Sequence, residues 1–496
     1  MNGYLKDSHL VKILCTFTKP ELRSFGRLVN SPYFNTSSQT TLLYGEIKKF
    51  YPRFAGAEFT REKLFAKIYL GKKFSKDLMN KLVSNLIALA EEFILLNSNP
   101  YRKQNLLLGL RKRKLHSLFL SEYSKIQKKN KFNLFAAEEI QQQILTEEEY
   151  GDYFLDTDKY RMWDIQTDLS MEYHLIRFLY KAAQVFRQKT FLNTNKDSRT
   201  NVAYHLETAL DLTGLLEQVR GSDIKNKEII SHYISLVMLN SAKDKKLYEE
   251  IKKYISGNPL INETKDIYIG YIYLLDFLSH TLKLVKGDER IYYLNEKKII
   301  YKEIERVYFA TGRIKMLFAF FRNFILSGIN THDLEWCEYV LNKYLPQILE
   351  KGNESVGKYY EALILFHKGR YSESMDKLSF FKSDKFVMDK DVHFYDIRIL
   401  RFMLYYELNF HEEALSLAET FMYQLKKSRN MPASHRSSAE SFVKNYKKII
   451  LYVLNNDKDS LRLLAEKIDA ERSYSGREWL LNKTKEISKE NKKGAN

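Results

Sequence analysis

Apolar residues recur at helical spacing along most of this 496-residue chain. Segments such as 231–255 and 445–470 place apolar side chains three and four positions apart, with charged or polar residues between them. That periodicity is typical of amphipathic helices. Alternating runs of valine, threonine and isoleucine, which would indicate strands, are hard to find. Because only 7 prolines and 19 glycines interrupt the chain, the pattern predicts an all-α protein.

A repeated unit of two helices and a turn marks the second half of the chain. An apolar helix, a Gly or Asn and a second amphipathic helix recur around Gly287, Gly328, Gly369 and Asn409, at intervals of 41, 41 and 40 residues. Gly and Asn tolerate the left-handed backbone conformation that ends a helix. Acidic residues follow each turn, where they would offset the positive end of the second helix dipole. The spacing predicts stacked helix pairs with a period of about 40 residues.

Two of these units resemble tetratricopeptide repeats (TPRs). The stretches YYEALILFHKGRYSES and LRFMLYYELNFHEEAL carry the small-residue and aromatic pattern of that motif around a turn of the form G-x-Y-x-E-A. The period is about 40 rather than 34 residues, and Ser374 stands where the repeat usually has alanine. The resemblance implies a TPR-like α-solenoid, a superhelix of about eight antiparallel helix pairs.

The pattern divides the chain into three parts. Residues 1–98 predict a compact N-terminal helical domain, in which Thr18 and Glu21 have capping-box spacing. Residues 99–482 are expected to form the TPR-like solenoid. The remaining residues, 483–496, are rich in lysine and poor in apolar side chains, so we expect a disordered basic tail there.

The stretch NSPYFNTSS, residues 30–38, interrupts the helical pattern of the N-terminal domain. Proline disfavours helix in the residue before it, so the first long helix should end near Asn30. We expect a structural corner in which two aromatic side chains fold inward and fix the angle between helices. Its residues are Pro32, Tyr33 and Phe34. The next helix should then begin with Thr36 and Gln39 as a capping box, or with Asn35 as its cap.

Residues 60–93 offer one route to nucleic acid. A helix, a short turn and a second helix resemble the helix-turn-helix half of the domains that precede TPR arrays in some bacterial transcriptional activators. Lysines near the second helix could contact phosphates. The same helix carries an apolar stripe typical of a core face, and Asn80, Ser84 and Asn85 are the few residues left to face a groove. The stripe comprises Leu78, Met79, Leu82, Leu86, Leu89 and Phe93.

The net charge of +18, from 80 basic and 62 acidic residues, favours an anionic partner. The densest basic stretch, residues 101–132, holds ten Lys or Arg and one acid. We expect seven of its side chains to form a site for an anion or an acidic partner. These are Arg111, Lys112, Arg113, Lys114, Lys125, Lys128 and Lys129. Alternatively, the segment 138–158, with eight acids and no Lys or Arg, pairs antiparallel with this stretch and neutralises it.

No catalytic or metal-binding constellation stands out in the sequence. There is no H-E-x-x-H sequence and no paired-cysteine zinc spacing, so we expect neither metal nor cofactor. The stretch GNESVGKY (352–359) fits the first seven positions of a phosphate loop, but Tyr359 takes the magnesium position and the preceding segment is helical. Two cysteines, Cys15 and Cys337, exclude a disulfide framework and suit the reducing cytoplasm. No apolar run is long enough to predict a membrane span.

The N-terminal segment is similar to that of a group of bacterial proteins that pair an SPYFN-bearing helical domain with TPR-like repeats. The resemblance is carried by residues 31–35 and by the stretches EKLFAKIY and LVSNLIALAEEF. Because that group has no established activity, it implies the architecture only. Helical-repeat arrays commonly hold a peptide or another protein. We therefore predict a non-enzymatic, cytoplasmic interaction or scaffold protein with an acidic partner. The alternative is a nucleic-acid-binding regulator that contacts phosphates through residues 60–132.

Overall fold

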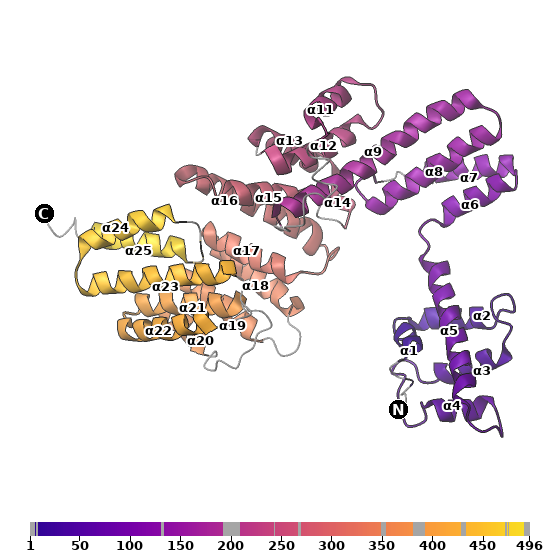
Figure 1. Ribbon diagram of the computed structural model, residues 1–496, viewed down its shortest axis with the longest axis horizontal. Coiled ribbons are helices and arrows are strands. Elements are labelled where there is room, and N and C mark those ends of the chain that lie inside the picture. Colours follow the sequence, from indigo (N-terminus) through magenta and orange to yellow (C-terminus); the bar gives the residue numbers. More distant parts are fainter. Residues whose placement is uncertain are drawn as a thin grey trace. The chain divides into compact units, whose positions relative to one another are not determined.

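The computed structural model describes residues 5, 8–129, 133–191, 209–242, 244–265, 269–348, 354–379, 392–427, 433–471, 474 and 476–490. Every regular element within these ranges is a helix (Figure 1). The all-α prediction is therefore confirmed for the described part of the chain. The chain divides into two compact units. Unit 1 comprises residues 1–131 and 141–167, and unit 2 comprises residues 132–140 and 168–496.

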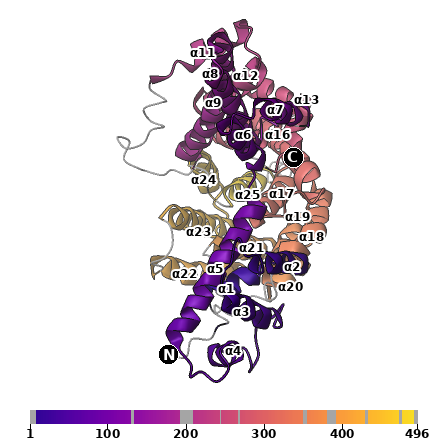
Figure 2. The same cartoon turned by 90° about the vertical axis from the view of Figure 1, so that its right-hand side faces the viewer.

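Five helices enclose the first core of unit 1. They are α1 (His9–Leu14), α2 (Lys19–Val29), α3 (Ser38–Lys48), α4 (Arg61–Ile68) and α5 (Lys76–Ser98). The long α5 packs against α1, α2 and α3 (Figure 2), and one cluster of buried side chains extends from Leu5 to Phe93. The predicted apolar stripe of α5 is buried, except that Leu78 is 41% exposed. The predicted capping box also forms, because the backbone N–H of Thr18 donates to Glu21 Oε2 at 2.7 Å.

The turn after α2 contains the predicted structural corner, Pro32, Tyr33 and Phe34. The prediction that both aromatic rings fold inward is wrong. Tyr33 is 87% exposed and Phe34 is 37% exposed, and the two rings contact each other edge to face. Asn35 fastens the turn instead, because its amide nitrogen donates to Val29 O at 2.8 Å and to Thr41 Oγ1 at 3.0 Å. A short amide can satisfy a backbone carbonyl and a hydroxyl from two helices at once, which a phenyl ring cannot.

The two helix ends beside this turn lie close to where the sequence predicts them. Helix α2 ends at Val29, with Asn30 as its C-cap. Helix α3 is capped by Ser37, whose hydroxyl accepts from the backbone N–H of Thr40 at 3.2 Å. The predicted cap at Thr36 is therefore one residue early, because Asn35 Oδ1 accepts from the N–H of Ser37 and holds that residue in position.

Four further helices follow: α6 (Arg102–Lys112), α7 (His116–Lys129), α8 (Ala137–Asp156) and α9 (Tyr160–Phe191). Their packing in unit 1 encloses a carboxylate. Glu147 of α8 is 2% exposed and accepts hydrogen bonds from four neutral donors. The donors are Tyr123 and Gln127 of α7, Gln143 of α8 and Gln166 of α9. Because a buried charge must keep its hydrogen bonds, Glu147 fixes how α7, α8 and the start of α9 meet.

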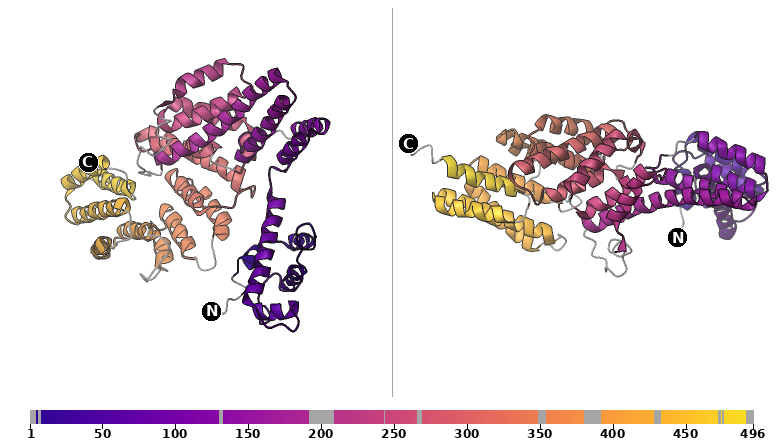
Figure 3. Two further views of the ribbon diagram at one scale, coloured as in Figure 1. Left: turned by 45° about the vertical axis from the view of Figure 1, so that its right-hand side comes forward. Right: turned by 90° about the horizontal axis from the view of Figure 1, so that it is seen from above.

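Unit 2 is built largely from helical hairpins. Its helices are α11 (Leu212–Gly221), α12 (Lys227–Ala242), α13 (Lys245–Gly257), α14 (Pro259–Glu263), α15 (Tyr271–Thr281), α16 (Gly287–Ile304) with a π-helical turn (Glu305–Phe309), α17 (Phe318–Asn330), α18 (Leu334–Ile348), α19 (Glu354–His367), α20 (Tyr371–Ser379), α21 (Val392–Glu407), α22 (His411–Lys427), α23 (Ala433–Leu454), α24 (Lys458–Ala470) and α25 (Arg477–Glu490). Helices consecutive in sequence pack together from α15 to α25. In addition, α17, α19, α21, α23 and α25 contact one another in that order, so they form one layer of the stack (Figures 1 and 3).

Six helix pairs are joined by one type of turn. Each helix ends two residues before a left-handed residue, and the next helix begins two residues after it. The N–H after the left-handed residue donates to the carbonyl four positions before that residue, at 2.8–3.0 Å in all six turns. This bond, with a second from the left-handed residue itself, defines the Schellman motif. The left-handed residues are Lys114, Asp158, His332, Gly369, Asn409 and Asn456.

Of the four predicted turn residues, Gly287, Gly369 and Asn409 are left-handed as expected, and the prediction is wrong at Gly328. Gly328 lies inside α17, and the left-handed residue that ends this helix is His332, with φ 55°. The interval from this turn to the next is therefore 37 residues rather than 41. The glycine has a different role, because a Cβ on Gly328 would lie 2.4 Å from Cys337 Sγ and 3.0 Å from Asp333 O. It lets α17 and α18 approach closely.

The predicted disordered tail, residues 483–496, is wrong over its first part. Helix α25 continues to Glu490, Thr484 is fully buried, and Lys483 Nζ lies 2.9 Å from Glu407 Oε1. A helix on the edge of a stack needs apolar residues on one face only, so a low apolar content did not indicate disorder. Residues 491–496 lie outside the described part of the chain.

We expect Gly328→Ala to destabilise unit 2 by about 1–3 kcal/mol, because the added methyl group overpacks the contact between α17 and α18. The measurement is the free energy of unfolding from urea titration followed by circular dichroism. Gly257→Ala is the matched control: Gly257 ends α13, and a Cβ at this position would meet nothing within 4 Å, so this change should not destabilise the protein. Equal stability of the two variants would contradict the close-approach role of Gly328.

Candidate functional site

Arg111, the first of the seven basic candidates, is committed to the fold. Its three guanidinium nitrogens each lie 2.8 Å from a carboxylate oxygen of α8, and its side chain is 13% exposed. The carboxylates belong to Glu149, Asp152 and Asp156. The predicted neutralisation by the acidic segment therefore holds for Arg111. This residue joins α6 to α8 and has no charge left to offer an external anion.

Five other candidates remain exposed, and we call them the basic turn: Lys112, Arg113, Lys114, Lys125 and Lys128. Three of them are consecutive at the Schellman turn between α6 and α7, where Lys114 adopts the left-handed conformation. Arg113 donates to Gly109 O at 3.0 Å, and Lys125 forms a surface ion pair with Glu122 on its own helix. The side chain of the seventh candidate, Lys129, lies outside the described part of the structure.

Exposed leucines accompany the basic turn. Leu115 and Leu118, at the start of α7, are 41% and 56% exposed. Leu118, Lys125 and Lys128 stand seven and three positions apart on α7, so they lie on one helix face. A surface that combines leucine with lysine matches a partner bearing apolar and acidic groups, whereas a phosphate backbone offers the leucines no apolar contact.

The predicted nucleic-acid contact through α4 and α5 depends on a few polar residues of α5, and one of them is engaged within the fold. Asn80 of α5 accepts a hydrogen bond from Arg61 of α4 at 2.6 Å, so it is engaged within the fold. The described residues 61–98 contain no strand that could form a wing. Of the three residues expected to face a nucleic acid, Ser84 and Asn85 remain, on a helix whose other faces are largely buried in the core.

A groove of about 550 Å³ lies beside the contact between α2 and α5. Leu95 and Leu96 in its wall are 65% and 48% exposed. The complete lining comprises Ser24, Leu28, Glu92, Phe93, Leu95, Leu96, Asn97, Asn99 and Arg102. Sequence reasoning missed this groove, although a signal was present: the apolar run Ile94–Leu95–Leu96 continues past Phe93, where the core stripe of α5 ends.

A second cavity, of about 420 Å³, is lined by residues of α11, α12 and α13 in unit 2. His232 in its wall is 4% exposed and stacks on Tyr254, with ring centroids 4.4 Å apart. Burial is the larger effect and lowers the pKa of His232 to about 3, and the backbone of Ile269 opposes this shift. The imidazole is therefore neutral at physiological pH.

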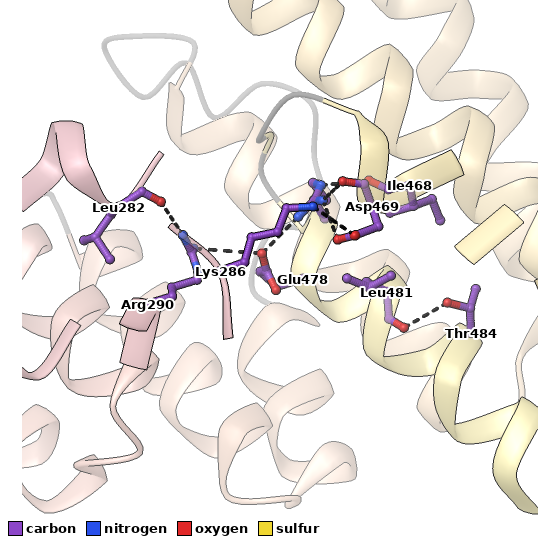
Figure 4. A network of polar contacts seen from close by, with 9 residues as sticks. Leu282, Lys286, Arg290, Ile468, Asp469, Glu478, Leu481 and Thr484 are labelled. Carbon is purple, nitrogen blue, oxygen red and sulfur yellow. Dashed lines mark hydrogen bonds and ion pairs between the residues drawn. The ribbon is translucent and has the colours of Figure 1, made fainter. Parts of the chain in front are cut away.

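A network of charges joins the loop before α16 to the C-terminal hairpin of unit 2 (Figure 4). Lys286 Nζ lies 3.0 Å from Asp469 Oδ2, although the two residues are 183 positions apart in sequence. Arg477, which is 9% exposed, donates to the backbone carbonyls of Ile468 and Asp469 and pairs with Glu478. These nitrogens are occupied within the fold, so we assign the network to holding the last hairpin in place.

The described residues hold no cluster of three or more His, Cys, Asp or Glu side chains arranged to bind a metal ion. Within the same part of the chain, none of the helices combines the length and apolar character needed to cross a bilayer. Both cysteines are free thiols, with Cys15 exposed and Cys337 buried. Burial, with neighbouring carboxylates, raises the pKa of Cys337 to about 12, which keeps it an unreactive thiol.

We expect Arg111→Met to lower the free energy of unfolding of unit 1 by about 1–3 kcal/mol, because the carboxylate of Glu149 is left partly buried without its partner. Urea titration followed by circular dichroism measures the change. Arg113→Met is the matched control, since the Arg113 side chain is exposed, and should change stability by less than about 0.5 kcal/mol. Equal losses in the two variants would show that the three contacts of Arg111 do not stabilise the fold.

We expect His232 to make unit 2 sensitive to acid. Its pKa is about 3 in the folded protein and 6.5 in an unfolded chain, so the unfolded state binds the proton more readily. The stability contribution is complete above pH 6.5 and is lost as the pH falls towards 3. Between pH 7.5 and 5 the loss from this residue is about 2 kcal/mol. His232→Phe should reduce the acid-induced loss of unfolding free energy by that amount, and an unchanged pH dependence would contradict the assignment.

Comparisons of the chain with protein-family models, with curated proteins and with solved structures gave no match.

Proposed function

We propose that this protein is a non-enzymatic interaction or scaffold protein that works in the cytoplasm and holds an acidic protein or peptide. The observation that carries the proposal is the presence of exposed leucines beside exposed cations, both at the basic turn and at the groove of α2 and α5. Such a surface suits a ligand with apolar and acidic groups. The net charge of +18 would favour the approach of that ligand from a distance.

We further propose that the hairpins from α17 to α25 act as a TPR-like solenoid that presents binding surfaces. The repeated Schellman turns and the layer formed by α17, α19, α21, α23 and α25 support this interpretation. Arrays of this kind expose extended surfaces because each repeat contacts only its neighbours. Ser374 is compatible with the alanine position of the repeat, since its buried hydroxyl donates to Ala362 O at 2.6 Å.

The alternative function is a nucleic-acid-binding regulator. One observation favours it: Lys112, Arg113 and Lys114 are consecutive, exposed and located at a turn, where three cations can reach successive phosphates. Nucleic-acid binding of this type would be electrostatic and would weaken steeply with salt.

Fluorescence anisotropy with the full chain tests these proposals. The probes are a labelled amphipathic helical peptide of about 16 residues with Leu on one face and Glu on the other, the same peptide with Lys in place of Glu, and a mixed-sequence single-stranded oligonucleotide. We expect the Glu peptide to bind at about 0.15 M salt and the Lys peptide not to bind. Absence of binding to the Glu peptide would overturn the proposed function.

The oligonucleotide decides the alternative. We expect its affinity to collapse between low and physiological salt. Oligonucleotide binding that persists at about 0.15 M salt, and that weakens when Lys112, Arg113 and Lys114 are changed to Glu, would instead establish the nucleic-acid-binding function.

A further inference from the structure

The array of hairpins from α15 to α25 meets itself at its two ends. Each helix of the array packs against the next one in sequence. The first hairpin, α15 and α16, also contacts the last hairpin, α24 and α25, because Lys286 Nζ lies 3.0 Å from Asp469 Oδ2 (Figure 4). The array is therefore closed by a contact between residues that are 183 positions apart in sequence.

Two ion pairs cross this junction. The first joins Lys286 to Asp469, and in the second Arg290 Nη2 lies 3.9 Å from Glu478 Oε1. The two cations are four positions apart at the start of α16, so they lie on the same side of that helix. The two carboxylates stand at the end of α24 and the start of α25. A positive surface of the first hairpin thus faces a negative surface of the last.

Each surface is held in place by its own hairpin. Arg477 lies 3.2 Å from Asp469 Oδ1 and 3.0 Å from Glu478 Oε1, and it also donates to the carbonyls of Ile468 and Asp469. On the opposite side, Arg290 donates to Leu282 O at 2.6 Å. Because these bonds lie within the hairpins, the charged groups keep their positions whether or not the junction is formed.

Close helix packing does not reinforce the ion pairs. In the described part of unit 2, α24 and α25 pack on each other and on α23, but neither of them packs closely against α15 or α16. The two hairpins instead enclose a cavity of about 490 Å³, lined by residues of both. Leu284 in its wall is 63% exposed. The junction therefore lacks the buried apolar contacts that join neighbouring hairpins elsewhere in the array.

The exposure of the ion pairs limits their strength. The side chains of Lys286 and Asp469 are 74% and 46% exposed, and those of Arg290 and Glu478 are 32% and 57% exposed. Exposed pairs of this kind each change an equilibrium by about fivefold at most. Salt screens them, since the Debye length falls to about 3 Å at 1 M ionic strength. Closure of the junction is therefore modestly favoured and sensitive to salt.

We propose that the pairs Lys286–Asp469 and Arg290–Glu478 form an electrostatic clasp, which closes the array from α15 to α25 and releases the last hairpin from the first when its charges are screened or removed. The helices stay folded when the clasp opens, because the contacts of Arg477 and the packing of α24 and α25 on α23 lie on one side of the junction. Opening makes the walls of the cavity accessible. This inference concerns a contact within the chain and does not depend on the proposed function.

Single-molecule energy transfer between two dyes on the full chain tests the clasp. The dyes are attached to Ile291→Cys on α16 and Leu463→Cys on α24, which replace side chains that are 58% and 66% exposed. Cys15→Ser removes the exposed native thiol, and Cys337 is buried. At about 0.05 M salt we expect a closed population with high transfer. At about 1 M salt a second population with low transfer should grow, while circular dichroism shows unchanged helicity.

Variants of the first pair identify the contact responsible. At low salt, Lys286→Glu should lower the ratio of closed to open molecules by about fivefold or more, because it replaces an attraction with a repulsion. Lys246→Glu is the matched control, since it makes the same change of charge at an exposed residue of α13, outside both pairs. Its ratio should equal that of the protein with Lys286 and Lys246 intact.

A double-mutant cycle with Lys286→Met and Asp469→Asn tests the pair directly. Because either change alone breaks the same contact, we expect the double variant to open little more than the single ones. Effects that multiply in the double variant would overturn the inference. So would a ratio that Lys286→Glu leaves unchanged, or an equal response to Lys246→Glu. Loss of helicity together with loss of transfer would show that the last hairpin unfolds, and would also overturn the clasp.

Discussion

The carboxyl end of each helix leaves backbone carbonyls without partners inside the helix, and the rest of this structure depends on how they are satisfied. At six helix pairs one residue turns left-handed, and the two backbone bonds of the Schellman motif bind the free carbonyls. The next helix begins two residues later, so it must run back along the first one. The turn thus reverses the chain, and in five of the six pairs the two helices pack closely against each other: α6 and α7, α17 and α18, α19 and α20, α21 and α22, and α23 and α24.

Close helix pairs require small or polar side chains at the points of nearest approach. Gly328 provides such a point between α17 and α18, and the buried Ser374 provides another by donating to a backbone carbonyl of α19. Buried carboxylates fix other contacts. Glu147 accepts hydrogen bonds from four neutral donors, and Glu305 accepts them from Tyr339, Tyr344 and Lys343. Because desolvated carboxylates lose more by a missing bond than apolar groups do, these residues specify which helix faces meet.

The excess of positive charge is divided between structure and surface. Arg111 and Arg477 are engaged with carboxylates and carbonyls of the fold, while the basic turn and Arg102 of the α2–α5 groove remain exposed. Position in the sequence does not distinguish the cations engaged within the fold from the exposed ones, since Arg111 and Lys112 are adjacent. Exposed leucines accompany the exposed cations at both surfaces, and this combination directs the proposed function towards a protein ligand with acidic and apolar groups.

The sequence by itself determined the helical class, the capping box of Thr18 and Glu21, the buried stripe of α5 and the turns at Gly369 and Asn409, because local backbone preferences and a period of 3.6 residues control these features. Tertiary structure decided the rest. Lys114 adopts a left-handed conformation that a lysine rarely takes, His332 and Asp158 adopt it at positions that no glycine or asparagine marks, and Gly328 serves packing between helices instead of a turn. The outward rings of Tyr33 and Phe34, the ordered end of α25 and the groove of Leu95 and Leu96 depend on which neighbouring helix covers each side chain. That information lies in contacts between distant residues and is absent from any local pattern.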